Sequence, residues 1–361
     1  MAPATHNKNA VQSADFHPRR LLRSGHLQTV FGNYLPRANS LPPAEEQLVE
    51  VSPATEHQIS SQVLCHCHWQ PEDVRAARPT VIIVHGLEGS SGSQYVIGNS
   101  DKLWQAGCNI VRMNMRNCCG TEALTPTLYH SGLSGDVDAV MRFFVDLHHL
   151  QSIALIGYSM GGNLVLKLTG ELGKDPPPQL RSVVGVSPVI DLAPSSAALH
   201  LLQNRVYEMK FVRAMLRRFR RKASLFPRAF DPNRAIGISS LRDFDERIIA
   251  LYSGFAGAED YYYRVAAARV IDEITVPTLI LNSLDDPFIR LAPDTRDKII
   301  ANPNITFLET AQGGHCAFLA QPDPATGYDG YWAEHTLVRF ILANSKAAPE
   351  RVAAKIDIDA R

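Results

Sequence analysis

The chain has 361 residues, of which 45% are hydrophobic and 20% are charged. Such a composition is typical of a globular protein, and a chain of this length buries a large core without disulfides or bound metals. The formal net charge is zero, so the overall charge does not favour nucleic-acid binding.

The ends of the chain and its apolar runs bear on its location. Residues 1–15 are polar and lack the apolar run of a secretory signal, and we expect them to form a disordered tail. Residues 346–361 are expected to form a second tail, which leaves a single domain over residues 16–345. No segment reaches the roughly 18 to 20 apolar residues of a membrane span. We therefore expect a soluble protein of the cytoplasm that binds no nucleic acid.

The six cysteines are too few and too scattered for a disulfide framework. Two of them lie in the run Cys65-His66-Cys67-His68, which contains residue types that bind metals. On a strand, alternate side chains point to opposite faces, so the two thiols and the two imidazoles cannot converge on one ion. We expect reduced thiols, two half-buried strand faces and no metal site here.

The spacing of apolar residues predicts a series of strands and helices after a polar, proline-bearing stretch at residues 36–53. In chain order we expect strands at 62–69, 80–84 and 109–113, a helix at 133–149, a strand at 152–156, a helix at 161–172, strands at 181–187 and 277–281, a helix at 293–300, a strand at 305–308 and a helix at 331–343. Short apolar strands that alternate with amphipathic helices favour an α/β fold with a mainly parallel sheet flanked by helices.

One long segment interrupts this alternation. Residues 190–270 contain helical patterns but no clear strand, although sheet strands precede and follow them. Insertions at such a position act as a lid over a site at the carboxyl ends of the strands. We therefore expect a helical cap over residues 190–270.

A candidate nucleophile lies in the segment Gly157-Tyr158-Ser159-Met160-Gly161, which has the pattern G-x-S-x-G. In the nucleophile elbow of α/β-hydrolases, the serine occupies a sharp, strained turn between a strand and a helix. Small flanking residues let the two elements pass closely. The apolar strand before this segment and the helix after it supply that context, so Ser159 is the predicted nucleophile.

Two backbone N–H groups are expected to form an oxyanion hole beside this serine. One belongs to Met160, the residue after the nucleophile. The other should come from the loop after an earlier strand, and Leu87 in the segment His85-Gly86-Leu87 is our candidate. We expect the His85 side chain to hydrogen-bond the loop backbone rather than to act in catalysis.

The acid and the base should follow the serine along the chain in that order. Asp285 and Asp286 come after one late strand, and His315 lies in a glycine-rich loop after the next. Asp286 is the preferred acid because it directly precedes a proline bend, whereas Asp285 is better placed to cap the turn. His315 is the preferred base, since His335 lies inside the last helix and His200 inside the cap.

Together these residues predict a serine hydrolase for carboxylic esters. His315 would accept the Ser159 proton, Asp286 would stabilise the imidazolium, and water would resolve the acyl-enzyme. This chemistry needs no metal and no organic cofactor, and its substrate is a small-molecule ester. The same residues also serve acyl transfer to an alcohol, so acyltransferase action is an alternative. A non-catalytic binding protein of the same fold is a second alternative.

Several segments together resemble the YheT-like α/β-hydrolases of bacteria and their eukaryotic relatives, the abhydrolase-domain lipases. The resemblance runs from about Phe16 to Phe340 and rests on the segments GHLQT at 25–29, HGLEG at 85–89, YHSG at 129–132, DDPF at 285–288 and GGH at 313–315. It implies the α/β-hydrolase fold and a triad of Ser159, Asp286 and His315. It also implies hydrolysis of esters with short to medium acyl chains, with lipids as the substrates of some members.

Two of these segments, 25–29 and 129–132, have no role that their chemistry dictates. Contact with the substrate and attachment of the N-terminal segment or a loop to the domain both remain open for them. The chain also departs from the family at residues 116–120, which read RNCCG where RGCSG is more frequent. Asn117 can adopt the left-handed backbone that a glycine would adopt there, so the loop is expected to keep its shape.

A basic segment lies inside the expected cap. Between residues 210 and 228 no acidic residue interrupts eight basic ones, which are Lys210, Arg213, Arg217, Arg218, Arg220, Arg221, Lys222 and Arg228. Apolar residues are interleaved at near-helical spacing. We expect a solvated helix whose apolar face packs on the domain; the alternative is peripheral contact of segment 210–228 with an anionic membrane.

Overall fold

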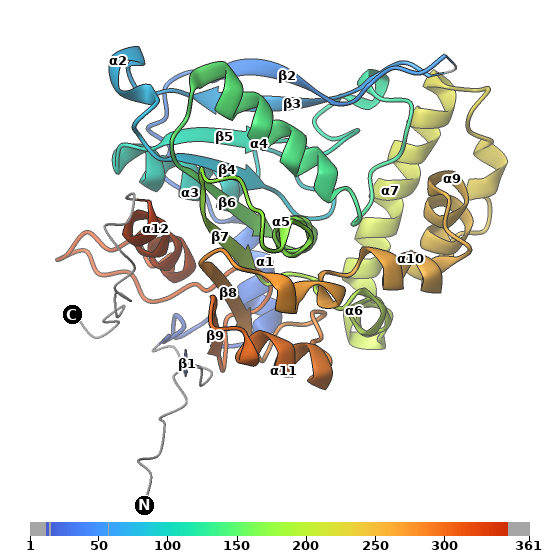
Figure 1. Cartoon of the computed structure of the whole chain (residues 1–361). Coiled ribbons are helices and arrows are strands. Elements are labelled where there is room, and N and C mark those ends of the chain that lie inside the picture. The colour runs from blue at the N-terminus through green and yellow to red at the C-terminus, as the bar shows by residue number, and fades with distance from the viewer. Residues whose placement is uncertain (1–11, 14–15, 57, 346–361) are drawn as a thin grey trace, which may run out of the picture.

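The computed structural model describes residues 12–13, 16–56 and 58–345 (Figure 1). Gln12–Ser13 form a short strand, β1, that pairs with the parallel strand β9 (Ile305–Thr310). The rest of the expected N-terminal tail and the C-terminal tail at 346–361 lie outside the described residues.

The strands form one sheet in the order β1-β9-β8-β7-β6-β4-β5-β3-β2. All neighbours from β1 to β5 are parallel, and β3 and β2 add an antiparallel edge, which confirms the mainly parallel sheet. The remaining strands are β2 (Glu45–Ser52), β3 (Ser61–His68), β4 (Thr80–Val84), β5 (Asn109–Met113), β6 (Ile153–Tyr158), β7 (Leu180–Val186) and β8 (Thr278–Ser283).

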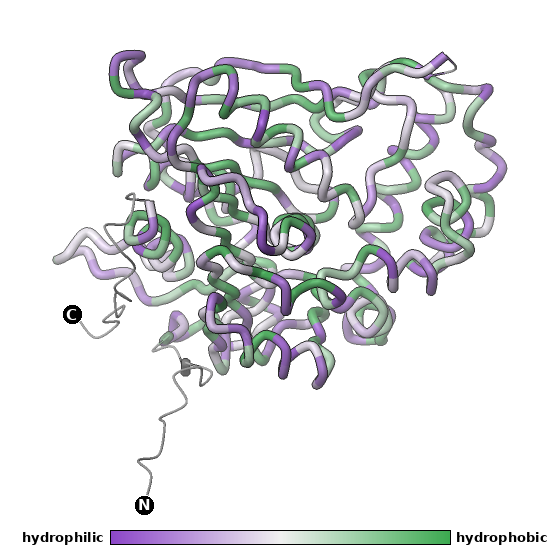
Figure 2. Tube along the Cα trace, viewed as in Figure 1, coloured by the Kyte–Doolittle hydropathy of each residue, from purple (hydrophilic) through white to green (hydrophobic). Residues whose placement is uncertain are grey.

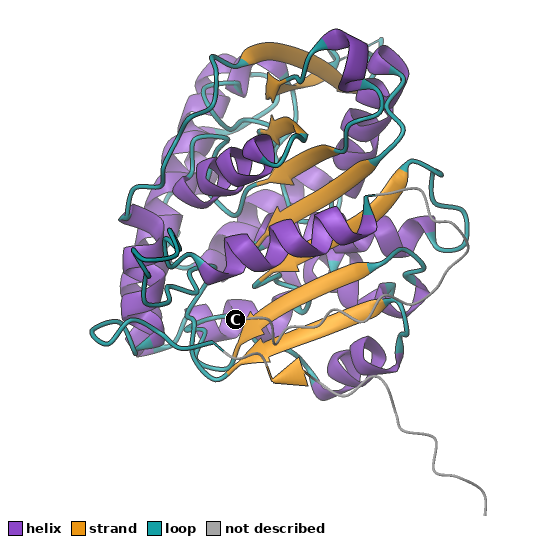
Figure 3. Ribbon diagram, turned by 90° about the vertical axis from the view of Figure 1, so that its left-hand side faces the viewer, coloured by secondary structure: helices purple, strands orange, loops and turns teal. Residues whose placement is uncertain are grey.

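Helices cover both faces of this sheet, as Figure 3 shows. The helices outside the cap are α1 (Gly25–Tyr34), α2 (Glu72–Arg75), α3 (Gln94–Gln105), α4 (Ser134–His148), α5 (Met160–Leu172), α11 (Pro293–Ala301) and α12 (Trp332–Asn344). Neighbouring residues of β4 point to opposite cores. Ile82 packs in the core under α4 and α5, and Ile83 in the core under α3 and α12. Strands buried on both faces explain the continuous apolar runs of the sequence, and Figure 2 shows hydrophobic residues concentrated along the central strands.

The segment between β7 and β8 is helical, as expected. It contains α6 (Leu192–Leu199), α7 (Arg205–Leu225), α8 (Leu241–Phe244), a π-helical turn (Asp245–Ala250), α9 (Leu251–Ser253) and α10 (Ala258–Val265). Figure 1 shows α7 standing across one end of the sheet. Phe219, Phe244 and Ile248 contribute to a hydrophobic core of the cap itself, so the cap is a packed layer rather than a loose loop.

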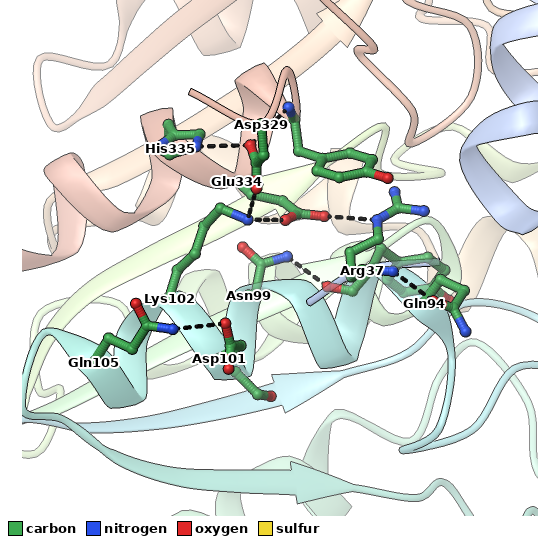
Figure 4. Close-up of polar contacts among 12 residues, drawn as sticks. Arg37, Gln94, Asn99, Asp101, Lys102, Gln105, Asp329, Glu334 and His335 are labelled. Carbon is green, nitrogen blue, oxygen red and sulfur yellow. Dashed lines mark hydrogen bonds and ion pairs between the residues drawn. The ribbon is translucent and has the colours of Figure 1, made fainter. Parts of the chain in front are cut away.

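Besides the short β1 and α2, three longer elements outside the cap were absent from the sequence-based series: α1, β2 and α3. The edge strand β2 lies inside the polar stretch at residues 36–53. It was missed because an edge strand with one solvent-exposed face carries few apolar residues. Helix α3 escapes the apolar pattern because it buries polar groups toward α12 (Figure 4). There Glu334 accepts hydrogen bonds from Arg37 at 3.1 Å and from Lys102 at 2.8 Å. His335, which lies inside the last helix as expected, is partly exposed and pairs with Asp329 at 2.9 Å.

Strand β3 places the cysteine–histidine run as the alternation predicts. Cys65 and Cys67 are buried in the core under α4 and α5. On the other side, His66 Nδ1 lies 2.9 Å from Ser91 Oγ and His68 Nε2 lies 3.0 Å from an Arg112 nitrogen. Thiols and imidazoles therefore occupy opposite faces of one strand.

Candidate active site

Ser159 lies in the turn between β6 and α5, with backbone angles of φ 54° and ψ −114°. This conformation is strained for a residue with a side chain. The neighbouring glycines are sterically required: a Cβ on Gly157 would lie 2.2 Å from the Gly161 carbonyl oxygen, and one on Gly161 would lie 2.4 Å from the Val84 carbonyl oxygen. The strand–turn–helix context expected for this motif is confirmed.

Ser159 lines a cavity between the sheet domain and the cap. Aromatic and aliphatic side chains dominate its lining. The cap contributes apolar residues from α7 and from the segments around it, including Leu192, Leu199, Phe211, Met215, Phe219, Phe244 and Ile249. A concave, mostly apolar cavity with a few polar groups is the usual form of a site for a small organic molecule.

The structure brings His315 and Asp286 together. His315 Nδ1 donates a 2.8 Å hydrogen bond to Asp286 Oδ2, while Asp286 Oδ1 accepts the N–H groups of Phe288 and Ile289, each at 3.0 Å. Burial opposes the Asp286 carboxylate, but His315 and these N–H donors outweigh it and lower its pKa. Burial likewise opposes the imidazolium, yet the facing Cys316 and Asp286 raise the pKa of His315 above its usual range. The pair is therefore built to stabilise a positive imidazolium.

The first turns of α1 and the carboxylate of Asp285 hold the loop that carries His315. Thr29 Oγ1 accepts the His315 N–H at 2.9 Å, and Asp285 Oδ1 accepts the Gly314 N–H at 2.8 Å. Gln28 donates to the Leu319 carbonyl at 3.0 Å and accepts the Leu319 N–H at 2.7 Å. Segment 25–29 thus attaches the N-terminal region to the loop of His315, which is one of the two roles left open by the sequence.

A single backbone carbonyl links this loop to the nucleophile. Val186 O at the end of β7 accepts the Ser159 N–H at 2.9 Å and lies 3.7 Å from Cys316 Sγ. In the part of the chain that is described, the Ser159 hydroxyl has no hydrogen-bond partner, so the structure shows the Asp286–His315 bond but no direct bond from His315 to Ser159. Such contacts are frequently long in ligand-free enzymes and tighten when substrate binds.

The candidate oxyanion donors also lie at the cavity, since both Leu87 and Met160 line it. Met160 is the first residue of α5, and the first N–H groups of a helix have no acceptor within the helix. The N–H of Gly86, the residue before Leu87, already donates to the Tyr95 hydroxyl at 3.0 Å.

His85 hydrogen-bonds the loop backbone, as the sequence predicted. Its Nδ1 donates to the Gly86 carbonyl at 2.8 Å, and its Nε2 accepts the Met115 N–H at 3.2 Å. Burial lowers the pKa of His85 to about 4, so this ring is a neutral structural element at pH 7.

The basic segment 210–228 belongs mostly to α7. Its apolar residues Val212, Met215 and Phe219 are buried in the cap core, so the expected packing on the domain is confirmed. Two basic residues are internal: Arg218 pairs with Glu88 at 3.0 Å, and the buried Lys222 donates to Asn117 Oδ1 at 2.7 Å and to the carbonyls of Glu122 and Thr125. Asn117 itself has a left-handed backbone, with φ 64°, as expected for the departure at 116–120.

Segment 129–132 also reaches the site. Tyr129, His130 and Ser131 line the cavity, and the Tyr129 hydroxyl donates to Glu88, the partner of Arg218. This segment therefore lines the cavity and also binds Glu88, which pairs with Arg218 of the cap.

Residues 79–322 match a protein-family model described as alpha/beta hydrolase fold. The chain belongs to the alpha/beta hydrolase fold family. Among solved structures, this hydrolase fold aligns with 2,6-dihydroxy-pseudo-oxynicotine hydrolase, with a TM-score of 0.53 and 15% identity over 85% of this chain and 71% of that one. It also aligns with the esterase Pf2001 of Pyrococcus furiosus, with a TM-score of 0.52 and 12% identity over 86% of this chain and 100% of that one.

Sequence relatives of this alpha/beta hydrolase carry esterase and lipase names. The YheT protein of Escherichia coli (strain K12), provisionally named an esterase, is 28% identical over 85% of this chain and 88% of its own. Phospholipase ABHD3 of Mus musculus is 27% identical over 68% of this chain, and the match spans 59% of that phospholipase. The "Medium-chain fatty acid ethyl ester synthase/esterase 2" of Saccharomyces cerevisiae is 25% identical over 73% of this chain and 61% of its own.

Across the described ranges of this hydrolase, none of the helices combines the length and the apolar character needed to cross a membrane.

Proposed function

We propose that the protein hydrolyses carboxylic esters with Ser159 as the nucleophile, His315 as the general base and Asp286 as its partner. The observation that carries the proposal is the 2.8 Å bond between His315 and Asp286, formed beside a cavity that Ser159 lines from a strained turn. Covalent catalysis by a serine needs a base beside it and a third group that orients this base.

The chemical steps follow from this arrangement. Because His315 Nδ1–H donates to Asp286, Nε2 is the nitrogen left to accept the Ser159 proton. The Ser159 oxygen then attacks the ester carbonyl, and the N–H groups of Leu87 and Met160 are proposed to hold the oxyanion. The imidazolium returns its proton to the leaving alcohol, which departs and leaves the acyl-enzyme. Water, deprotonated by His315, attacks this ester and releases the acid and free Ser159.

The proposed substrates are esters of short- to medium-chain acids, including lipids. The apolar lining of the cavity favours hydrocarbon chains, whose burial is stabilised by the removal of apolar surface from water. The phospholipase and esterase names of the relatives support the same substrate class.

The proposal is tested with p-nitrophenyl esters from acetate to palmitate, assayed with wild type and Ser159→Ala in parallel. We expect hydrolysis by the wild type, an optimum at short or medium chains, and a loss of at least about a thousandfold in the variant. Labelling of Ser159 by an active-site phosphonate is the independent measurement. Wild type that neither hydrolyses any ester nor reacts with the phosphonate would support the non-catalytic binding protein instead.

Acyl transfer to an alcohol is the second candidate, and the name of the yeast synthase/esterase relative favours it. Adding ethanol to the assay separates the two activities. Hydrolysis alone yields the free acid, whereas acyl transfer yields the ethyl ester in excess of its uncatalysed formation.

We also propose that the exposed side of α7 contacts anionic lipid. Arg213, Arg217 and Arg220 are exposed there, and the only acidic residue of α7, Glu208, is buried. Val206, at the start of the same helix, is 75% exposed. Arg217→Gln with Arg220→Gln should weaken co-sedimentation with phosphatidylglycerol vesicles, whereas Arg142→Gln with Lys174→Gln, at exposed positions outside the cap, should not. Equal vesicle binding by both double variants would exclude this contact.

A further inference from the structure

A polar cluster lies in the cap, at the otherwise apolar wall of the cavity. Asp245 begins the π-helical turn Asp245–Ala250 and lines the cavity with only 5% of its surface exposed. Tyr262 from α10 and Ser196 from α6 line the same cavity. Single π-helical turns inside helices frequently occur at functional sites, because the extra residue displaces a side chain from the regular helical pattern.

The three side chains form a directed chain of hydrogen bonds. The Tyr262 hydroxyl donates to Asp245 Oδ2 at 2.8 Å, so its oxygen is left to accept from Ser196 Oγ at 3.0 Å. Within the described ranges, no group donates to the other oxygen, Asp245 Oδ1. The cluster therefore presents one unused acceptor of a buried carboxyl group.

Nothing near this carboxyl group compensates for its burial with a full positive charge. No salt bridge to Asp245 occurs in the described part of the chain, and burial raises the pKa of Asp245 to about 7. The side chains beside it in the cavity wall, Phe244, Ile249 and Leu241, are apolar. An oxygen of a largely buried carboxyl group that lacks a partner costs free energy, and a ligand that forms a hydrogen bond with it recovers part of that cost. A purely hydrocarbon ligand does not.

We infer that the Asp245–Tyr262–Ser196 cluster recognises a hydroxyl group on the substrate, which forms a hydrogen bond with Asp245 Oδ1 while the ester lies at Ser159. The inference rests on the proposed ester hydrolysis and narrows its substrates to esters that carry a hydroxyl group away from the ester bond. Sites built to hydrogen-bond a substrate hydroxyl discriminate strongly against the analogue that lacks it.

The test uses matched pairs of esters that differ only in a terminal hydroxyl group. One series is p-nitrophenyl esters of linear acids with four to ten carbons, with or without an ω-hydroxyl group. The other is decanoate esters of linear alcohols, with or without an ω-hydroxyl group, and it distinguishes a hydroxyl on the alcohol from one on the acyl chain. The measured quantity is kcat/KM for the ester with the ω-hydroxyl group divided by kcat/KM for the ester without it.

We expect this ratio to reach at least about tenfold in wild type at the best chain length of one series. It should fall to about one in Asp245→Leu and decrease in Tyr262→Phe, which keeps the ring but removes the hydroxyl group. Asp260→Asn, on the outside of α10, is the control and should keep the wild-type ratio. Because the readout is a ratio, a partly unstable variant remains informative, and thermal unfolding measures its stability.

Two results would overturn the inference while leaving ester hydrolysis intact: a ratio near one in wild type for both series, or an unchanged ratio in both Asp245→Leu and Tyr262→Phe. Preference for an ω-ammonium ester over the ω-hydroxyl ester would also overturn it, because the carboxylate would then act as a charge. Absence of hydrolysis of every ester, together with an unlabelled Ser159, would overturn the proposed function and this inference with it.

Discussion

Asp285 and Gly314 join the two loops that supply the proposed acid and base. The Asp285 carboxylate accepts the Gly314 N–H at 2.8 Å, and the next residue of each loop, Asp286 and His315, forms the second bond, also at 2.8 Å. Two neighbouring bonds of this kind fix both the separation and the orientation of the loops. The adjacent aspartates therefore have different roles, with Asp286 on the imidazole and Asp285 on the backbone that carries it.

The first prediction concerns the two aspartates. Asp286→Ala should lower kcat by about ten-thousandfold, since the imidazole loses the group that sets its tautomer. Asp285→Ala should lower kcat by about ten- to a hundredfold, because a shifted base is poorly aligned but still present. Steady-state kinetics on a p-nitrophenyl ester, with thermal unfolding as a check on folding, measures both. Equal losses would contradict the assignment of Asp286 as the partner of His315.

The second prediction concerns pH. A general base acts when it is neutral, and Asp286 helps to raise the pKa of His315, so activity should increase with pH through a value above the usual histidine range. Asp286→Asn removes the carboxylate charge, and the pKa of His315 should then fall. Titration of the His315 imidazole by NMR in both proteins measures the shift, and the acid limb of kcat/KM in wild type should follow the same pKa. An unchanged imidazole pKa in the variant would contradict the pairing.

The elements around the nucleophile were predictable because their energetics are local. Strands β4 and β5 have the same bounds in the sequence analysis and in the structure, and β4 is an apolar run because it is buried on both faces. The order serine, acid and histidine then placed Asp286 and His315 at the ends of later strands.

The support around these residues was not predictable, because it depends on contacts between distant parts of the chain. Thr29 and His315 are 286 residues apart, and nothing in either segment specifies the other. Helix α1 was missed partly because Gly25 and Gly32 weaken its helical pattern. Both glycines are needed for close approach: a Cβ on Gly25 would lie 1.9 Å from the Asp285 carbonyl oxygen, and one on Gly32 would lie 2.4 Å from the Ala317 Cβ.

The third prediction concerns Thr29 as a positioning residue. Thr29→Val keeps the shape of the side chain but leaves the His315 N–H without its acceptor, so the base loop should shift. We expect kcat to fall by about tenfold with little change in KM, because substrate contacts in the cavity are not altered. Thr29→Ser restores the hydroxyl group and should restore kcat. A valine variant with the kcat of wild type would show that α1 does not position the base.

The fourth prediction concerns stability away from the site. Glu334 is the shared partner of Arg37 and Lys102 in the buried cluster of Figure 4. Glu334→Gln keeps the size of the side chain but leaves the buried Arg37 with a neutral partner and Lys102 with Asp329 alone, so the free energy of unfolding should fall by about 3 kcal/mol. Chemical denaturation measures this loss, and kcat measured at low temperature should change little, because the cluster lies between α3 and α12.

Arg142→Gln provides the matched control for this charge cluster. Arg142 pairs with Asp138 at 2.8 Å on the surface of α4, with more than half of the Arg142 side chain exposed to solvent. Solvent screens such a pair, so its removal should cost at most about 0.5 kcal/mol. If both variants lose the same free energy of unfolding, burial does not decide the strength of the Glu334 contacts.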